Sequence, residues 1–252
     1  MLTFQIASDL HIECNTDNYL DPLSFITPVS DILILAGDIG SFYKLNQLKT
    51  FLINLCIHFK IVLYIPGNHE YYTQNGYNPE KMDVLLHNFK TLKDDIHNLY
   101  ILNRSSVQIE DVCIVGCTLW SEPKIEVPKF IVRIEEMNTK NYHKTHKDDL
   151  EYIKNMITYC KRKEKKLLIV THYPPTYSVI TKLHKKKDKY ISLYANDLDY
   201  LLHKDNIHTW IAGHIHTNFD LISDGSTRIV SNQLGKPKDN VKDYNKKMII
   251  II

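Results

Sequence analysis

The segment Ile32-Leu33-Ile34-Leu35-Ala36-Gly37-Asp38 joins five consecutive apolar residues to a glycine and a carboxylate. A short run rich in Ile and Leu and bounded by Gly predicts a β-strand that is buried on both faces, as in the parallel sheets of α/β proteins. Asp38 then stands just beyond the carboxyl end of that strand. Because open α/β sheets bind ligands in the crevice at this end, the segment predicts both a sheet and a site beside it.

Four other segments repeat the arrangement of an apolar run followed by a polar cluster. The runs span residues 4–7, 61–65, 167–170 and 210–212. The clusters that follow them are Asp9-Leu10-His11, Gly67-Asn68-His69-Glu70, Thr171-His172 and Gly213-His214-Ile215-His216. We expect all the clusters to meet in one crevice, because each follows a buried strand. Imidazole, carboxylate and amide groups together are ligands for divalent transition metals.

Apolar periodicity outside these segments predicts the remaining elements. A helix is expected over about 44–58, a second one starts at Asn78-Pro79-Glu80, a third runs from about 146 to 163, and a short one covers 196–203. Strands are expected at 99–103, 106–109 and 112–118, and the carboxyl-terminal part reads as antiparallel strands at 209–212, 219–222, 227–231 and 247–252. These elements suggest two sheets packed face to face with helices outside, in one domain over residues 1–252.

Composition narrows the class of protein. The chain has 252 residues, 44% of them hydrophobic, and a formal net charge of +2, which favours no acidic partner. The basic runs 161–166 and 182–189 leave nucleic-acid binding open, but we favour a solvated surface. No apolar run approaches the roughly 20 residues that span a bilayer. The five cysteines form no Cys-x-x-Cys pair and no targeting segment precedes the first strand, so we expect buried, reduced thiols and a cytoplasmic location.

Each polar cluster has a plainer interpretation when it is taken alone. Asp9 and Asp38 could be turn formers, and His172 could be a loop histidine shaped by the prolines after it. We favour a joint site because all five clusters occur in order, each after a strand. His143, His146 and Asp148 lie outside this set. They could form a third metal site, but we interpret them as a solvated helix start.

The ordered set resembles the calcineurin-like metallophosphoesterase superfamily from Asp9 to His216. Four segments are similar to a branch of small cytosolic phosphoesterases: Ser8-Asp9-Leu10-His11, Gly67-Asn68-His69-Glu70-Tyr71-Tyr72, Thr118-Leu119-Trp120 and Gly213-His214-Ile215-His216. The resemblance implies a four-layer α/β/β/α sandwich of two mixed β-sheets with helices on the outer faces. It also implies two divalent metal ions, drawn from Mn, Fe, Zn or Mg. Asp9, His11 and His216 would hold one ion, Asn68, His172 and His214 the other, and Asp38 would bridge them.

The chemistry of these groups is consistent with that assignment. A carboxylate shared by two cations offsets their repulsion, and neutral Asn68 leaves the site positive for a phosphate dianion. Two histidines one residue apart, His214 and His216, would project to the same side of a short extended segment, each toward a different ion. The glycines before Asp38, Asn68 and His214 would allow tight turns.

The expected activity is hydrolysis of phosphomonoesters or phosphodiesters by a metal-activated hydroxide. The resemblance implies that His69 assists the leaving group, and an imidazole suits proton transfer near pH 7. The alternatives are a nuclease or a protein Ser/Thr phosphatase of the same superfamily, and a non-catalytic scaffold. Protein phosphatases of the superfamily carry an Asp-Arg pair after the Gly-Asp motif, where this chain has Ile39-Gly40-Ser41.

Three further points stay open from the sequence. Arg104, Lys129 or Arg133 could supply the missing positive charge. The residue that orients His69 is not identified. Tyr71 and Tyr72 either stack on a substrate ring or pack beneath the loop, while Trp120 belongs to the core or to the wall of the pocket.

Overall fold

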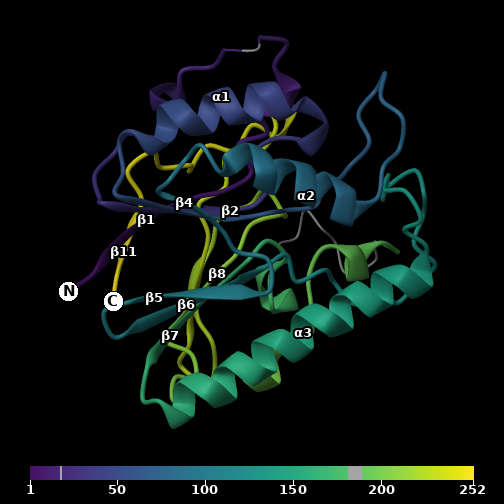
Figure 1. Ribbon diagram of the computed structural model, residues 1–252. Helices are drawn as coiled ribbons and strands as arrows, with labels where there is room; N and C mark the ends of the chain where they lie inside the picture. The colour runs from purple at the N-terminus through teal and green to yellow at the C-terminus, as the bar shows by residue number, and fades with distance from the viewer. Residues whose placement is uncertain (18, 181–188) are drawn as a thin grey trace.

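The computed structural model describes residues 1–17, 19–180 and 189–252 and arranges them in four layers (Figure 1). Helices α1 (Leu45–Cys56) and α2 (Met82–Lys93) cover the outer face of one sheet. A second sheet lies against the inner face of the first, and α3 (Thr139–Arg162) covers its outer side. The α/β/β/α sandwich predicted from the sequence is confirmed. That residues 1–252 form one domain remains a prediction.

The first sheet has the strand order β11-β1-β2-β3-β4. The strands β1 (Thr3–Ala7), β2 (Ile32–Ala36), β3 (Ile61–Ile65) and β4 (Leu99–Ile101) are parallel, and β11 (Ile249–Ile251) pairs antiparallel with β1. The predicted last strand is therefore part of the sheet, and the two chain ends lie close together (Figure 1). The carboxyl ends of β1, β2 and β3 share one edge, where the first three polar clusters begin.

The second sheet has the strand order β5-β6-β7-β8-β10-β9. Its parallel strands are β6 (Val112–Cys117), β7 (Lys166–Thr171), β8 (Thr209–Ile211) and β10 (Arg228–Val230), and the edge strands β5 (Ser105–Ile109) and β9 (Asp220–Ile222) are antiparallel. The expectation of antiparallel strands near the carboxyl end holds for β9 and β10 but is wrong for β8 and β10, which pair in parallel because β10 lies between β8 and β9. Three-residue strands show the same side-chain pattern in either direction, so the sequence carries no sign of this.

Alternate residues of each strand enter different apolar layers. Leu33 and Leu35 of β2 pack with the helix layer of α1 and α2, and Ile32 and Ile34 pack between the two sheets. A third cluster joins the outer face of the second sheet to α3. Burial on both faces explains why the strands read as unbroken apolar runs. Each fully buried side chain of this size contributes about 1.5–3 kcal/mol.

Helix boundaries differ from those predicted. Helix α2 begins at Met82, because the Glu80 amide donates to the Tyr43 hydroxyl at 2.8 Å and holds the Pro79 region in a loop. Helix α3 begins at Thr139, where the Asn138 side chain caps the first turn. The predicted short helix over 196–203 is only the 3₁₀ turn Asp199–Leu201.

The structure also corrects the predicted environments of one histidine, His146, and one cysteine, Cys14. His146 is buried within α3, and its Nδ1 lies 2.6 Å from the Trp120 carbonyl oxygen, so it is a structural residue and not a solvated helix start. The five cysteines are free thiols, but Cys14 is exposed, unlike the other four.

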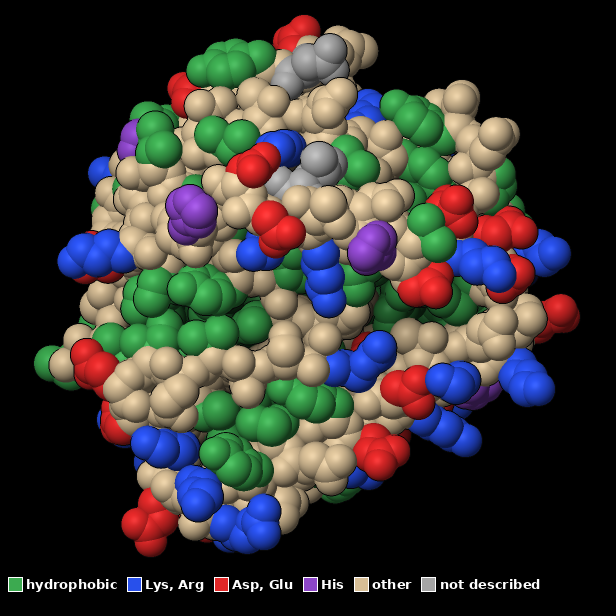
Figure 2. Space-filling model, viewed as in Figure 1, with side chains coloured by type: hydrophobic (Ala, Val, Ile, Leu, Met, Phe, Trp, Pro, Cys, Tyr) green, Lys and Arg blue, Asp and Glu red, His purple; other side chains and the backbone are tan. Residues whose placement is uncertain are grey.

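The surface shows no bias toward one sign of charge on the face drawn in Figure 2, where acidic and basic side chains are interspersed. Most of the second basic run, residues 182–188, lies outside the described residues. Within the described ranges, none of the helices combines the length and apolarity needed to cross a bilayer.

Candidate metal centre

The polar clusters lie at the same end of the two sheets, beyond the carboxyl ends of five strands. Asp9 and His11 follow β1, Asp38 follows β2, Asn68 and His69 follow β3, His172 follows β7, and His214 and His216 follow β8. The structure thus brings all eight predicted site residues together. It also shows how the two sheets share the site, since β1–β3 belong to the first and β7 and β8 to the second.

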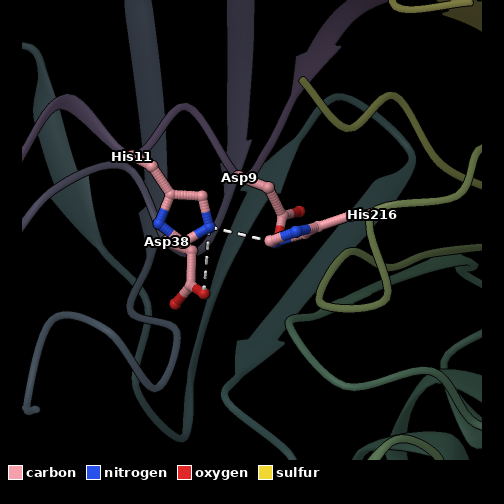
Figure 3. A group of neighbouring side chains, drawn as sticks. All are labelled: Asp9, His11, Asp38 and His216. Atoms are coloured by element: carbon pink, nitrogen blue, oxygen red, sulfur yellow. Dashed lines mark hydrogen bonds and ion pairs between the residues drawn. The ribbon is translucent and has the colours of Figure 1, made fainter. Parts of the chain in front are cut away.

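Asp9, His11, Asp38 and His216 form the first ligand group, with ligand atoms within 4.8 Å of one another (Figure 3). His11 Nε2 lies 2.9 Å from His216 Nε2 and 3.7 Å from Asp38 Oδ2. His216 Nε2 lies 3.3 Å from Asp9 Oδ1. Two imidazole nitrogens that face each other between two carboxylates fit a divalent cation.

Asp38, His172 and His214 form the second group, and Asn68 adjoins it. His172 Nε2 lies 3.2 Å from Asp38 Oδ1 and 2.9 Å from Asn68 Oδ1. His214 Nδ1 is buried without a hydrogen-bond partner. A buried acceptor without a partner is costly unless a ligand satisfies it. Asp38 turns Oδ2 toward the first group and Oδ1 toward the second, so it can be shared between two ions.

The second nitrogen of each histidine ligand candidate faces an oxygen atom. The pairs are His11 Nδ1 with Glu13 Oε1 at 2.9 Å, His216 Nδ1 with Asp239 Oδ2 at 2.5 Å, His172 Nδ1 with the Ala36 carbonyl at 2.9 Å, and His214 Nε2 with the Leu193 carbonyl at 3.1 Å. Metal-binding histidines are typically held this way, because the outer hydrogen bond fixes the tautomer and the ring orientation. The arrangement directs Nε2 of three rings and Nδ1 of His214 into the site.

The electrostatics of the site favour bound cations. Burial lowers the pKa of His172, but the adjacent Asp38 carboxylate outweighs burial and raises this pKa to about 9. Burial, with the charge of His172, lowers the pKa of His214 to about 3, so this ring is neutral as a ligand must be. The pKa of Asp38 lies well below its ordinary value, because His172 and His69 outweigh the effect of burial. The carboxylate charge that holds a proton on His172 would equally hold a metal cation.

His69 stands beside the two groups with a partner that the sequence did not identify. Its Nδ1 lies 3.3 Å from Glu13 Oε1, and its Nε2 lies 2.9 Å from the ammonium group of Lys236. Glu13 is buried, and hydrogen bonds from His11 and His69 outweigh that burial and lower its pKa to about 2. Glu13 therefore orients both a ligand candidate and His69. Its place two residues after His11 is the only sign of this in the sequence.

Glu70 links the loops that follow β2 and β3 by hydrogen bonds, a role that the sequence did not suggest. Its carboxylate accepts hydrogen bonds from the backbone amides of Asp38, Ile39 and Gly67 and from the Tyr64 hydroxyl. Burial and the charge of Asp38 raise the pKa of Glu70 to about 8 against these donors. The loops that carry Asp38 and Asn68 are thereby fixed relative to each other.

A cavity of about 490 Å³ opens over the site. Besides the polar groups at its base, its wall includes the aromatic rings of Tyr72, Tyr173 and Tyr190 and the cations Arg133 and Lys236. Tyr71 packs instead beneath the loop against Phe42, and Trp120 is buried in the core.

The three cations considered from the sequence occupy different places. Of these, Arg133 lines the site cavity. Arg104 pairs with buried Asp149 at 2.8 Å, and Lys129 lines a separate cavity. The cation closest to His69, Lys236, was not considered.

The backbone conformation of the segment that carries His214 and His216 differs from the prediction. His214 and His216 have φ angles of 76° and 50°, so their segment is a tight turn and not an extended strand, although each ring still joins a different ligand group. Gly37 adopts a left-handed backbone as expected, with φ of 87°. Gly213 serves close approach instead, since a Cβ there would lie 2.5 Å from Asp9 Oδ2.

Comparison with known proteins identifies relatives of this chain and of its fold. The family description "calcineurin-like phosphoesterase" matches residues 2–218. An uncharacterised protein of Acanthamoeba polyphaga mimivirus is 27% identical over 93% of this chain and 91% of its own length. The phosphopantetheinyl hydrolase of Mycobacterium tuberculosis has a similar structure, with a TM-score of 0.71 and 17% identity, covering 98% of this chain and 94% of that one. A dimetal phosphatase from Danio rerio gives a TM-score of 0.50 at 15% identity, over 91% and 86% of the two chains.

Proposed function

The chain belongs to the calcineurin-like phosphoesterase family, and on this premise we propose that it hydrolyses phosphoric esters with two divalent metal ions. The observation that carries the proposal is the pair of ligand groups that share Asp38, with His69 at the edge of the same cavity. Asp9, His11 and His216 would hold one ion with Asp38. Asn68, His172 and His214 would hold the other.

Two divalent ions bound there would lower the pKa of a bound water and offset charge on the phosphoryl oxygens. The chain itself positions the ester. Asp38, Asn68 and His69 line the cavity together with the rings of Tyr72 and Tyr173. A cavity of about 490 Å³ suits a small ester better than a long polymer.

In the proposed reaction His69 would protonate the leaving oxygen. The Glu13 carboxylate accepts from its Nδ1, which leaves Nε2 turned toward the cavity. Protonation of a leaving group by a positioned imidazole contributes roughly 10²–10⁴ in rate. The filled ligand positions and the presence of His69 argue against a non-catalytic scaffold. A cytoplasmic location is part of the proposal, supported by five free thiols.

The function is tested with p-nitrophenyl phosphate and bis(p-nitrophenyl) phosphate after reconstitution with Mn²⁺, Mg²⁺, Zn²⁺ or Fe²⁺. We expect turnover that a chelator abolishes, and close to two ions per chain by elemental analysis. Cleavage of single-stranded DNA and of phosphopeptides, measured in parallel, separates a nuclease or protein phosphatase from a small-ester hydrolase. Absence of both turnover and bound metal would contradict the proposal.

His69→Ala separates the proton-transfer role from a ligand role. We expect kcat to fall roughly 10²–10⁴-fold while the metal content stays that of the wild type. The exposed His97 provides the control, because His97→Ala should change neither quantity. Equal losses of metal and kcat in His69→Ala would instead place His69 among the ligands.

A further inference from the structure

Lys236 contacts the group that the proposed mechanism uses for proton transfer. Its Nζ lies 2.9 Å from His69 Nε2, and both side chains line the site cavity. An ammonium group donates hydrogen bonds and cannot accept them. His69 Nε2 must therefore be the acceptor in this contact, with the imidazole proton on Nδ1 facing Glu13. Lys236 and His69 Nε2 thus meet within the cavity that the candidate ligands also line.

The loop that carries Lys236 is fixed to the metal centre at several points. The Leu234 and Gly235 amides donate to the carbonyl oxygens of Ser8 and Asp9, at 3.1 and 3.0 Å. The Lys236 amide donates to Asp239 Oδ2 at 2.9 Å, and the same oxygen contacts His216 Nδ1. The side chain of Lys236 therefore starts from a backbone that is anchored to the segments of two ligand candidates.

The cavity offers few other positive charges for a phosphoryl group. The segment after Asp38 contributes Ile39, Gly40 and Ser41, all buried and none cationic. Arg133 also lines the cavity, but it is exposed and its guanidinium lies 5.6 Å from the centre of the Tyr72 ring. Lys236 is half-buried, and of these two cations it is the one whose contact with His69 places it over the site.

We propose that Lys236 is the cation that binds the substrate phosphoryl group, and that it makes the site favour phosphomonoester dianions over diesters. This rests on the proposed phosphoesterase function. When a phosphoryl group enters, the ammonium exchanges His69 Nε2 for a phosphoryl oxygen, which frees Nε2 to take up from solvent the proton that it then passes to the leaving oxygen. A monoester dianion has a third non-bridging oxygen and a second negative charge for this ammonium, which a diester lacks. Charge-assisted hydrogen bonds of this kind are the strong ones.

The test compares Lys236→Ala and Lys236→Arg with Lys238→Ala in the metal-reconstituted protein. Lys238 is the matched control, because it is an exposed lysine two residues further along the same loop. Three quantities are measured for each variant. They are the Kd of inorganic phosphate by calorimetry, kcat/KM for p-nitrophenyl phosphate and for its bis analogue, and the metal content.

We expect Lys236→Ala to weaken phosphate binding and monoester kcat/KM by roughly 10- to 100-fold, the range for a hydrogen bond to a charged group. The diester should lose no more than about 3-fold, because it lacks the second charge that the ammonium would pair. Lys236→Arg should recover most of the phosphate affinity, and Lys238→Ala should match the wild type. Metal content should not change in any of them.

Three results would overturn the inference. They are unchanged phosphate affinity in Lys236→Ala, equal losses for the two esters, and loss of metal, which would mark Lys236 as a support of the ligand shell. A wild-type protein without metal or turnover would refute the proposed function itself. An active wild type with an unaffected Lys236→Ala would refute only the role of Lys236.

Discussion

Five of the seven candidate ligands have a left-handed backbone, although none is a glycine. They are Asp9, His11, Asp38, His214 and His216, with φ between 47° and 76°. A non-glycine residue in this region costs on the order of 1–3 kcal/mol and persists only where its surroundings impose it. Here the Asp9 amide donates to the Gly37 carbonyl and the His214 amide to the Asp9 carboxylate. The concentration of backbone strain on these residues is typical of a functional site.

Gly213→Ala should damage the centre without removing a ligand. The new Cβ would lie 2.5 Å from Asp9 Oδ2 and 2.9 Å from Ser8 Oγ, so the Asp9 carboxylate must move. We expect the first ligand group to lose at least about 10-fold in metal affinity, and the fold to lose about 1–3 kcal/mol. Calorimetric metal titration and urea unfolding measure the two effects separately.

Gly76→Ala is the control for this substitution. Gly76, unlike Gly213, has a positive φ of 85°, and a Cβ there meets nothing within 4 Å. It should cost about 1 kcal/mol of stability and leave metal binding intact. Metal affinity in Gly213→Ala equal to that of Gly76→Ala would show that Asp9 is not a ligand.

At the scale of elements, helix α3 supports the site through the segment that follows β6. Asp149 of α3 pairs with Arg104 at 2.8 Å and accepts from the Trp120 amide at 3.4 Å. Trp120 packs against Tyr173, whose ring centre lies 3.9 Å from that of His214. The helix is therefore connected to a ligand candidate through two aromatic rings, although it contributes no ligand itself.

The buried Asp149 should give the fold a characteristic pH dependence. Burial raises the pKa of its carboxyl from 3.8 to about 6, although Arg104 opposes the shift. Between these pH values the native state holds a proton that the unfolded state has released, so stability falls as the pH rises through this window. The free energy of unfolding of the wild type, relative to Asp149→Asn, should drop by up to about 3 kcal/mol from pH 4 to 6.

Urea unfolding of both chains in the presence of a chelator measures this difference, because the chelator removes pH-dependent metal binding and the titration of the site itself is common to both chains. The difference in free energy of unfolding between the wild type and Asp149→Asn should not change with pH above about pH 6, where Asp149 is ionised in both the folded and the unfolded state. A relative stability that rises with pH over the window would mean that the Arg104 pair, and not burial, controls this carboxyl.

The sequence predicted best the elements whose side chains are buried on two faces. Five unbroken apolar residues in β2 fit only a strand between two apolar layers. The start of helix α2 was misplaced because a local cap signal at Asn78 competes with a tertiary contact, the Glu80 amide with Tyr43. At the site, the residues in or just after strand ends could be predicted from the sequence. Glu13, Asp239 and Lys236 could not, because their roles depend on contacts with His69 and His216.

At the scale of the whole molecule, the candidate centre lies where the two sheets meet. Asp9, Asp38 and Asn68 come from the first sheet, and His172, His214 and His216 come from the second. Direct hydrogen bonds already join the sheets here, including the Thr118 hydroxyl with the Pro66 carbonyl at 2.8 Å. Bound cations would add further links between the same two layers, so metal binding and global stability should be coupled.

Metal should therefore raise the melting temperature of the whole chain. At a free metal concentration of about 100 times Kd, binding to the native state alone adds about 2.7 kcal/mol. For a chain of this size that corresponds to an increase of about 5–10 °C in Tm. Calorimetric scans with Mn²⁺ or Zn²⁺ and with a chelator measure the shift. Asp38→Asn, which retains the shape of the shared ligand but not its charge, should lose most of it. An equal increase in Asp38→Asn would place the stabilising ions elsewhere on the molecule and would remove Asp38 from the centre of the proposed site.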